Sequence, residues 1–162
     1  MYLYKAVIFD WENCLAQTRK HPVTLSNGAE RLLNRLYEDG IQLAILTNGQ
    51  PGILDRYVKF DQIRPLFEAI VTARDVEAYK PQPDGIEAIL RQLSCLAEEV
   101  LMIGDSETDI AAGEAALVDT LLYLGEGETV TYSDEDISRI NPTYAVRSFA
   151  EVLELIAFGN NH

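Results

Sequence analysis

The chain has 162 residues, of which 48% are hydrophobic and 24% are charged, and we expect residues 1–162 to form a single globular domain. Its formal net charge of −13 argues against nucleic-acid binding, because that contact needs clustered lysine and arginine side chains. No apolar run approaches the roughly 20 residues that cross a bilayer, and the N-terminus shows no secretion signal, so we expect a cytoplasmic protein without a membrane partner.

Apolar runs alternate along the chain with amphipathic helical patterns. One clear helical pattern places Ala29, Leu32, Leu33 and Leu36 at i, i+3, i+4 and i+7, on a single helix face. In chain order, the expected elements are strand 5–9, helix 27–39, strand 41–46, strand 70–72, a helix from 83 to 93, strand 100–103, helix 106–116, strand 120–124 and a last helix that opens at 148–151 and ends before 159. Residues 125–139 are acidic and weakly patterned, and we expect a loop there with one helical turn at most.

Strands that are apolar along their whole length predict a parallel sheet with helices on both faces, and so an α/β fold. In such sheets, ligands bind beyond the carboxyl ends of the strands. The polar residues that follow the expected strand ends are Asp10, Glu12, Thr47, Asn48, Asp105 and Asp109. Lys80 precedes Pro81 in a turn that we expect on the same side of the sheet. The sequence therefore predicts a polar site at one edge of the sheet.

The residue types at this edge indicate phosphoryl chemistry. Carboxylates gathered in one place repel one another unless a cation neutralises them, and hard oxygen ligands of this kind suit Mg²⁺. A lysine and a hydroxyl beside the metal would offset the charge that develops on a transferring phosphoryl group. An aspartate in such a site can act as a covalent nucleophile and form an aspartyl-phosphate that water then cleaves.

The order of these residues matches a known set of motifs. The motifs are Asp10-x-Glu12-x-Cys14, Thr47, Lys80-Pro81 and Gly104-Asp105-x-x-x-Asp109. Together they resemble the four motifs of the haloacid dehalogenase superfamily, over about residues 4–124. The resemblance implies a Rossmann-like three-layer sandwich, with a mostly parallel sheet covered by helices on both faces. It also implies a Mg²⁺-dependent phosphatase that hydrolyses phosphomonoesters through an aspartyl-phosphate.

The resemblance further implies three catalytic residues, Asp10, Glu12 and Lys80. Asp10 would be the nucleophile, and Glu12 would be the general acid and base. Thr47 would bind the phosphoryl oxygens of the substrate, and we expect its neighbour Asn48 to be a substrate-binding residue as well. Lys80 would neutralise both Asp10 and the phosphate.

A metal site is implied in the same way. Asp105 would bind Mg²⁺ together with Asp10 and the backbone carbonyl of Glu12, and Asp109 would support the site. The spacing from Ser106 to Asp109 is also that of a capping box at a helix start, and this structural role is compatible with the metal role.

Several of these residues also have ordinary structural interpretations. Residues 47–49 form a natural turn sequence, and Lys80 taken alone could be a solvated loop lysine. Glu12 departs from the family, which usually has aspartate at this position in its phosphatases, and we expect slow turnover because of the extra methylene. Cys14 replaces a more usual threonine, either as a packing residue or as a thiol whose oxidation blocks turnover.

The spacing of the motifs leaves no room for the cap domain that many family members carry. Only about 16 residues separate Asp10 from the expected helix at Asn27, and Thr47 lies 33 positions before Lys80. We therefore expect an open site that accepts a phosphorylated metabolite or a phosphoprotein, unless a homodimer covers it. The alternatives to a phosphatase are a catalytically weak or inactive regulatory protein and a phosphotransferase or phospho-aspartate carrier.

Overall fold

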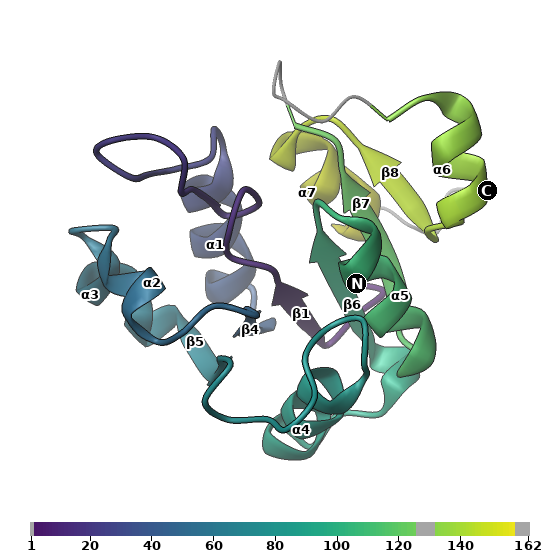
Figure 1. Cartoon of the computed structure of the whole chain (residues 1–162), viewed down its shortest axis with the longest axis horizontal. Coiled ribbons are helices and arrows are strands. Elements are labelled where there is room, and N and C mark those ends of the chain that lie inside the picture. Colours follow the sequence, from purple (N-terminus) through teal and green to yellow (C-terminus); the bar gives the residue numbers. More distant parts are fainter. Residues whose placement is uncertain (1, 126–131, 158–162) are drawn as a thin grey trace.

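The computed structural model describes residues 2–125 and 132–157 of the chain. Six strands form one sheet in which every neighbouring pair is parallel, in the order β5-β4-β1-β6-β7-β8 (Figure 1). The strands of this sheet are β1 (Ala6–Phe9), β4 (Gln42–Leu46), β5 (Phe67–Val71), β6 (Val100–Gly104), β7 (Asp119–Tyr123) and β8 (Tyr144–Val146). A separate antiparallel hairpin joins β2 (Ala16–Gln17) to β3 (Thr24–Leu25).

Helices cover both faces of the sheet, which makes three layers. The helices are α1 (Ala29–Glu38), α2 (Gly52–Asp55), α3 (Phe60–Ile63), α4 (Asp84–Leu93), α5 (Glu107–Ala115), α6 (Asp134–Ile140) and α7 (Phe149–Ala157). Helices α1 and α7 pack together on one face, while α4 and α5 lie on the other (Figure 1). The predicted α/β sandwich is therefore confirmed.

The core explains why the central strands are apolar throughout. Side chains alternate between the two faces of a strand, so a strand covered on both sides needs apolar residues at every position. Val7 and Phe9 of β1 pack with the α1 and α7 layer, whereas Ala6 and Ile8 pack with the α4 and α5 layer, and all four are fully buried. This arrangement holds β1 rigidly in the middle of the sheet, next to β4 and β6.

The second half of the chain differs in part from the sequence-based expectation. We expected a loop over 125–139 with one helical turn at most, but the structure contains the seven-residue helix α6, which begins in that range and ends one residue beyond it. Ser133 caps this helix by accepting a hydrogen bond from the backbone N–H of Asp136 at 3.0 Å. The rest of the expected loop, residues 126–131, lies outside the described residues. Strand β8 was not expected at all, and β5 begins three residues earlier than the predicted strand 70–72.

Short elements fill the two connections where related proteins can carry a cap. The segment between β1 and α1 contains the hairpin β2–β3, and the segment between β4 and β5 contains α2, α3 and a 3₁₀ turn, Arg64–Leu66. The two segments touch where Arg56 donates a hydrogen bond to the backbone carbonyl of Thr18 at 3.1 Å. Neither segment forms a separate domain. Among the helices in the described ranges, none is both long and apolar enough to cross a membrane.

Candidate active site

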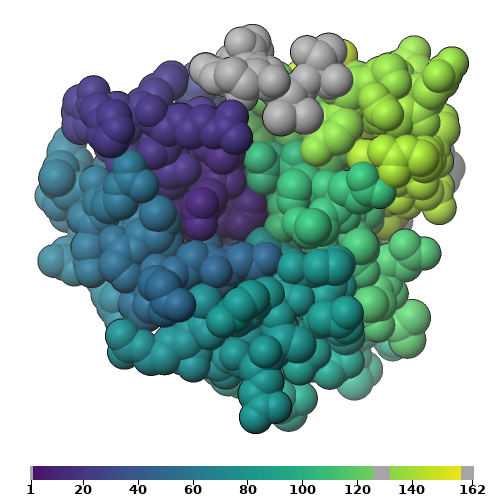
Figure 2. All heavy atoms as spheres, in the orientation of Figure 1, coloured from purple at the N-terminus to yellow at the C-terminus, as the bar shows by residue number. Residues whose placement is uncertain are grey.

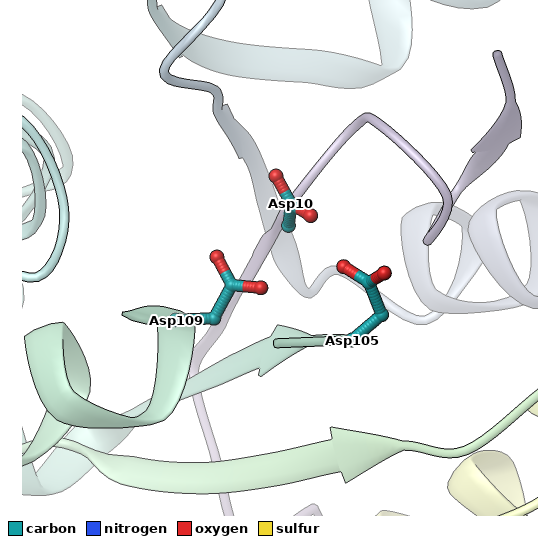
Figure 3. Close-up of side chains that lie close together, drawn as sticks. All are labelled: Asp10, Asp105 and Asp109. Carbon is teal, nitrogen blue, oxygen red and sulfur yellow. The ribbon is translucent and has the colours of Figure 1, made fainter. Parts of the chain in front are cut away.

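Three carboxylates meet at the carboxyl edge of the sheet. Asp10 directly follows β1, Asp105 directly follows the neighbouring strand β6, and Asp109 lies in the first turn of α5. One carboxylate oxygen from each residue lies within 4.8 Å of the others. Figure 3 shows the three side chains pointing toward a common space. In the space-filling view, the dark purple atoms of the N-terminal region are recessed between blue and green segments (Figure 2).

Lys80 joins this cluster from the connection between β5 and α4. Its Nζ donates hydrogen bonds to Asp10 Oδ1 at 2.9 Å, to Asp109 Oδ1 at 2.5 Å and to the backbone carbonyl of Leu46 at 3.1 Å. The residue is buried, so it is not a solvated loop lysine. Burial by itself lowers the pKa of Lys80, but the charges of the two carboxylates outweigh burial and raise the pKa above the ordinary lysine value. Lys80 therefore remains a cation at neutral pH.

Asn48 holds the backbone of Lys80 in place. Its side-chain Oδ1 accepts a hydrogen bond from the Lys80 N–H, and its Nδ2 donates one to the Lys80 carbonyl, both at 3.0 Å. This pair of bonds ties the end of β4 to the Lys80 turn across 32 positions of sequence. The amide of Asn48, which we predicted to bind substrate, is thus engaged with the protein backbone.

Thr47 and Glu12 lie together beside the cluster. The Thr47 hydroxyl is 3.5 Å from Glu12 Oε1 and accepts a hydrogen bond from the Gly49 N–H at 3.0 Å. The Glu12 carboxylate occupies space that a side chain at Gly49 would fill, since a Cβ there would lie 2.7 Å from Glu12 Oε1. Among the described residues, the three-carboxylate cluster consists of Asp10, Asp105 and Asp109, and the Glu12 carboxylate lies outside it.

The first turn of α5 fixes the direction of Asp109. Its Oδ2 accepts hydrogen bonds from the backbone N–H of Ser106 at 3.1 Å and from the Ser106 hydroxyl at 2.8 Å, which is the predicted capping box. Its Oδ1 receives the bond from Lys80. A Cβ at Gly104 would lie 2.3 Å from Asp109 atoms, so only glycine leaves room for this side chain. The structural role and the site role of Asp109 therefore coexist.

The carboxylates have unusual proton affinities. Burial raises the pKa of Asp10 well above its ordinary value, and the charge of Asp109 raises it further, against the opposing effect of Lys80. Burial is also the main cause that raises the pKa of Asp105 to about 6. One ammonium group thus incompletely offsets three closely spaced carboxylates. A second cation at this place would relieve the remaining repulsion.

The donor set fits Mg²⁺. Carboxylate oxygens are the hard ligands that Mg²⁺ prefers, and Mg²⁺ is usually held by only one or two protein carboxylates together with water and phosphate oxygens. Asp10 and Asp105 directly follow their strands at the carboxyl edge, whereas both carboxylate oxygens of Asp109 are already bonded, Oδ1 to Lys80 and Oδ2 to Ser106. The side chains of Asp10 and Asp105 are therefore the expected metal ligands, with Asp109 in support.

Magnesium should stabilise the protein more at neutral than at acidic pH. In the metal-free protein, Asp105 ionises at about 6 instead of 3.8, so its ionisation lowers folding stability as the pH rises through this range. Mg²⁺ needs the ionised carboxylates and competes with protons for them. At about 100 times its dissociation constant, Mg²⁺ should add about 2.7 kcal/mol to the free energy of unfolding near pH 7.5, and clearly less near pH 5.

Urea unfolding with Mg²⁺ or with EDTA, at both pH values, measures this difference. The Asp105→Asn variant is the control, because it should lose most of the stabilisation at either pH. A gain that is equal at the two pH values, or larger at pH 5, would contradict the assignment of the carboxylates as ligands.

Two residues beside the nucleophile belong to the core. Trp11 is fully buried and packs edge-on against Phe60 with ring centroids 5.4 Å apart. Cys14 is also fully buried, and burial raises the pKa of its thiol well above the ordinary value. A thiol of this kind is poorly reactive, which favours the packing interpretation of Cys14 over the redox one.

Sequence analysis placed Gly49 in a turn and Gly104 in a motif, but it gave neither glycine a role and missed Tyr132 altogether. The two glycines leave the space that Glu12 and Asp109 occupy. Tyr132 donates a hydrogen bond to the backbone carbonyl of Asp105 at 2.8 Å. No sequence signal marks this contact, because its acceptor is a backbone atom.

Comparison with known proteins defines the class. Residues 4–123 match the family model described as haloacid dehalogenase-like hydrolase, and the chain belongs to this family. It is 29% identical over 154 residues to the pyrophosphatase PpaX of Halalkalibacterium halodurans, covering 90% of this chain and 69% of that protein. It is 33% identical over 115 residues to a phosphoglycolate phosphatase of Colwellia psychrerythraea, covering 70% of this chain and 49% of that protein.

The chain is thus shorter than the curated relatives that it matches, and it spans about half to two thirds of their length. Among solved structures, the crystal structure of a haloacid dehalogenase family hydrolase from Deinococcus radiodurans, with bound phosphate and sodium, is similar. It aligns with a TM-score of 0.84 at 21% identity, over 98% of this chain and 97% of that chain. This similarity supports the fold.

Proposed function

We propose that the protein is a Mg²⁺-dependent phosphatase that hydrolyses phosphomonoesters through an aspartyl-phosphate on Asp10. The observation that carries the proposal is the buried contact of Lys80 with Asp10 and Asp109, next to Asp105 at the open edge of the sheet. Membership of the haloacid dehalogenase-like hydrolases and the phosphatase names of the two relatives support the same reaction.

In the first half of the reaction, a carboxylate oxygen of Asp10 attacks the phosphorus of the substrate. The bond from phosphorus to the leaving oxygen breaks, and that oxygen takes a proton from Glu12. Lys80 and the Thr47 hydroxyl are placed to offset the charge on the phosphoryl oxygens. Asp10 and Asp105 would hold Mg²⁺, which would add positive charge next to the phosphoryl group and the nucleophile.

In the second half, Glu12 accepts a proton from water as that water attacks the phosphorus of the aspartyl-phosphate. The bond between phosphorus and the Asp10 oxygen breaks, which releases inorganic phosphate and restores both carboxyl groups. The same residue thus acts first as acid and then as base. The position of Glu12, beside Thr47 and outside the metal cluster, suits this role.

The proposed substrate class is a phosphorylated metabolite or a phosphoprotein. Only a hairpin and two short helices stand in the connections where a cap could lie, so a bulky phosphoester can approach Asp10. We further propose that residues 1–162 form one domain and that the protein acts in the cytoplasm. A homodimer is one way in which the open site could be covered.

A second candidate function is a phosphotransferase or phospho-aspartate carrier with slow hydrolysis. The observation that favours it is Glu12, whose longer side chain lies against Gly49 and Thr47. If Glu12 activates water poorly, the aspartyl-phosphate persists and the phosphoryl group can pass to another acceptor.

Two substitutions of Glu12 should distinguish the effect of its carboxyl group from the effect of its side-chain length. Glu12→Gln should lower kcat about 10²- to 10⁴-fold, since it removes the proton that general acid–base catalysis requires. Glu12→Asp keeps the carboxyl group and should retain most of the rate or increase it. Steady-state rates of the two variants beside wild type measure the effect. If neither change alters the rate, Glu12 is not the proton donor.

Hydrolysis of p-nitrophenyl phosphate tests the proposed function as a whole. We expect hydrolysis that needs Mg²⁺, stops with EDTA and returns when Mg²⁺ is added in excess. A burst of about one equivalent of nitrophenol without further turnover would favour the carrier. No hydrolysis and no burst at high enzyme concentration would contradict both candidate functions.

A further inference from the structure

Helix α6, which the sequence analysis did not predict, packs beside residues 105–109, the turn that contains Asp105 and Asp109. Helix α6 packs against α5 through a small apolar cluster separate from the main core, formed by Ile110, Leu122 and Ile140 with Tyr132 and Ile137 against them. The family match ends at residue 123, before Tyr132 and α6 begin. This contact is therefore a feature that the shared motifs do not include.

Two polar contacts link this segment to residues 105–109. The Tyr132 hydroxyl donates to the backbone carbonyl of Asp105 at 2.8 Å, and Arg139 forms an ion pair with Glu107 at 2.6 Å. Both side chains of the ion pair are exposed, so it contributes little. The Tyr132 contact is half-buried, and its ring is held in the apolar cluster. Of the two contacts, the hydrogen bond of the Tyr132 hydroxyl is therefore the one that can affect the position of Asp105.

Tyr132 donates its hydrogen bond to the peptide group that orients Asp105 and Asp109. This peptide joins Asp105 to Ser106, at the point where β6 passes into α5. Its carbonyl accepts the bond from Tyr132, and its N–H donates to Asp109 Oδ2 at 3.1 Å. With hydrogen bonds at both ends, the peptide plane cannot rotate freely, and the two bonds strengthen each other.

The rotation of this plane decides where two carboxylates point. The Cα of Asp105 is itself an atom of this plane, so a plane that cannot rotate restricts the ψ angle of Asp105 and with it the direction of its side chain. The N–H at the other end of the plane holds Asp109. Partners of this kind, one step removed from the metal, tune metal affinity by holding the ligands in place.

We propose that Tyr132 is a positioning residue that sets the Mg²⁺ affinity of the site by fixing the Asp105–Ser106 peptide. The inference rests on the proposed function, since it takes Asp105 as a Mg²⁺ ligand. The Tyr132 hydroxyl bonds a backbone carbonyl and none of the reacting groups, so we assign it no catalytic role. Its effect should therefore appear in metal binding before it appears in the chemical step.

Tyr132→Phe tests the inference, because it removes only the hydroxyl and leaves the ring in its cluster. Titration calorimetry with Mg²⁺ should show about tenfold weaker binding, the lower end of the range for such partners. The Mg²⁺ concentration at half-maximal hydrolysis of p-nitrophenyl phosphate should rise by a similar factor. The fall in kcat at saturating Mg²⁺ should be much smaller than this.

Tyr4→Phe is the matched control. Its hydroxyl donates to Asp119 at 2.5 Å, at the opposite edge of the sheet, so its loss should lower stability without changing Mg²⁺ binding. Equal weakening of Mg²⁺ binding in both variants would mean general loosening of the fold and would overturn the inference. If Tyr132→Phe binds Mg²⁺ as tightly as a wild type that does bind it, the inference about Tyr132 is overturned and the proposed function stands. A wild-type protein that binds no Mg²⁺ would contradict the proposed function, and the inference with it.

Discussion

Asp10→Asn should abolish turnover while the protein remains folded. The asparagine amide has nearly the shape of the carboxylate but cannot form the acyl phosphate that the mechanism requires. We expect kcat to fall at least about 10⁴-fold, because loss of the nucleophile in a covalent mechanism costs on this scale. Hydrolysis of p-nitrophenyl phosphate with saturating Mg²⁺ measures the rate, and circular dichroism reports the fold.

An aspartate far from the site provides the comparison for this variant. Asp119→Asn also replaces an aspartate near a strand end of the sheet, but at the edge away from the site, and should keep the wild-type rate. If folded Asp10→Asn kept a rate within about tenfold of wild type, Asp10 would not be the nucleophile. The cluster of carboxylates would then need another explanation.

Lys80→Met should destabilise the metal-free protein and impair catalysis together. In the wild type, Lys80 Nζ lies 2.9 Å from Asp10 Oδ1 and 2.5 Å from Asp109 Oδ1. Methionine fills much of the same volume as lysine but leaves these two buried carboxylates without a cation. Breaking a buried ion pair by removing one partner costs about 3–5 kcal/mol. Part of this cost should be avoided by protonation of Asp10, whose pKa is already raised by burial.

Magnesium should recover part of the lost stability of this variant, because it supplies a positive charge to the same carboxylates. Urea unfolding of wild type and Lys80→Met, each with EDTA and with Mg²⁺, measures both effects. Lys59→Met, at an exposed position in the connection between β4 and β5, should change stability by less than about 0.5 kcal/mol. An equally small change in Lys80→Met would contradict the buried ion pair.

Much of the site could be predicted because it depends on local patterns. Asp10 and Asp105 each follow an apolar run, and parallel strands place their carboxyl ends at one edge of the sheet. The capping box of Asp109 is likewise a local signal, and the structure contains it. These features require only the periodicity of the chain and the layout of a parallel sheet.

Other features could not be predicted because they depend on distant partners. An asparagine such as Asn48 can bind a phosphate or a backbone, and only the fold brings it to Lys80, 32 residues away. Helix α6 contains just two apolar residues among charged ones, and it packs only because Ile110 and Leu122 provide a surface for it. Local propensity is a weak guide where tertiary packing decides.

The most direct test of the central claim is to trap the phosphorylated enzyme. Wild-type protein is mixed with Mg²⁺ and p-nitrophenyl phosphate, quenched in acid within the first turnovers, and mapped by mass spectrometry of its peptides. We predict one added phosphoryl group, located on Asp10, that appears only with Mg²⁺ and is absent in Asp10→Asn. Steady hydrolysis by a protein that carries phosphate on another residue, or on none, would contradict the claim that Asp10 is the nucleophile.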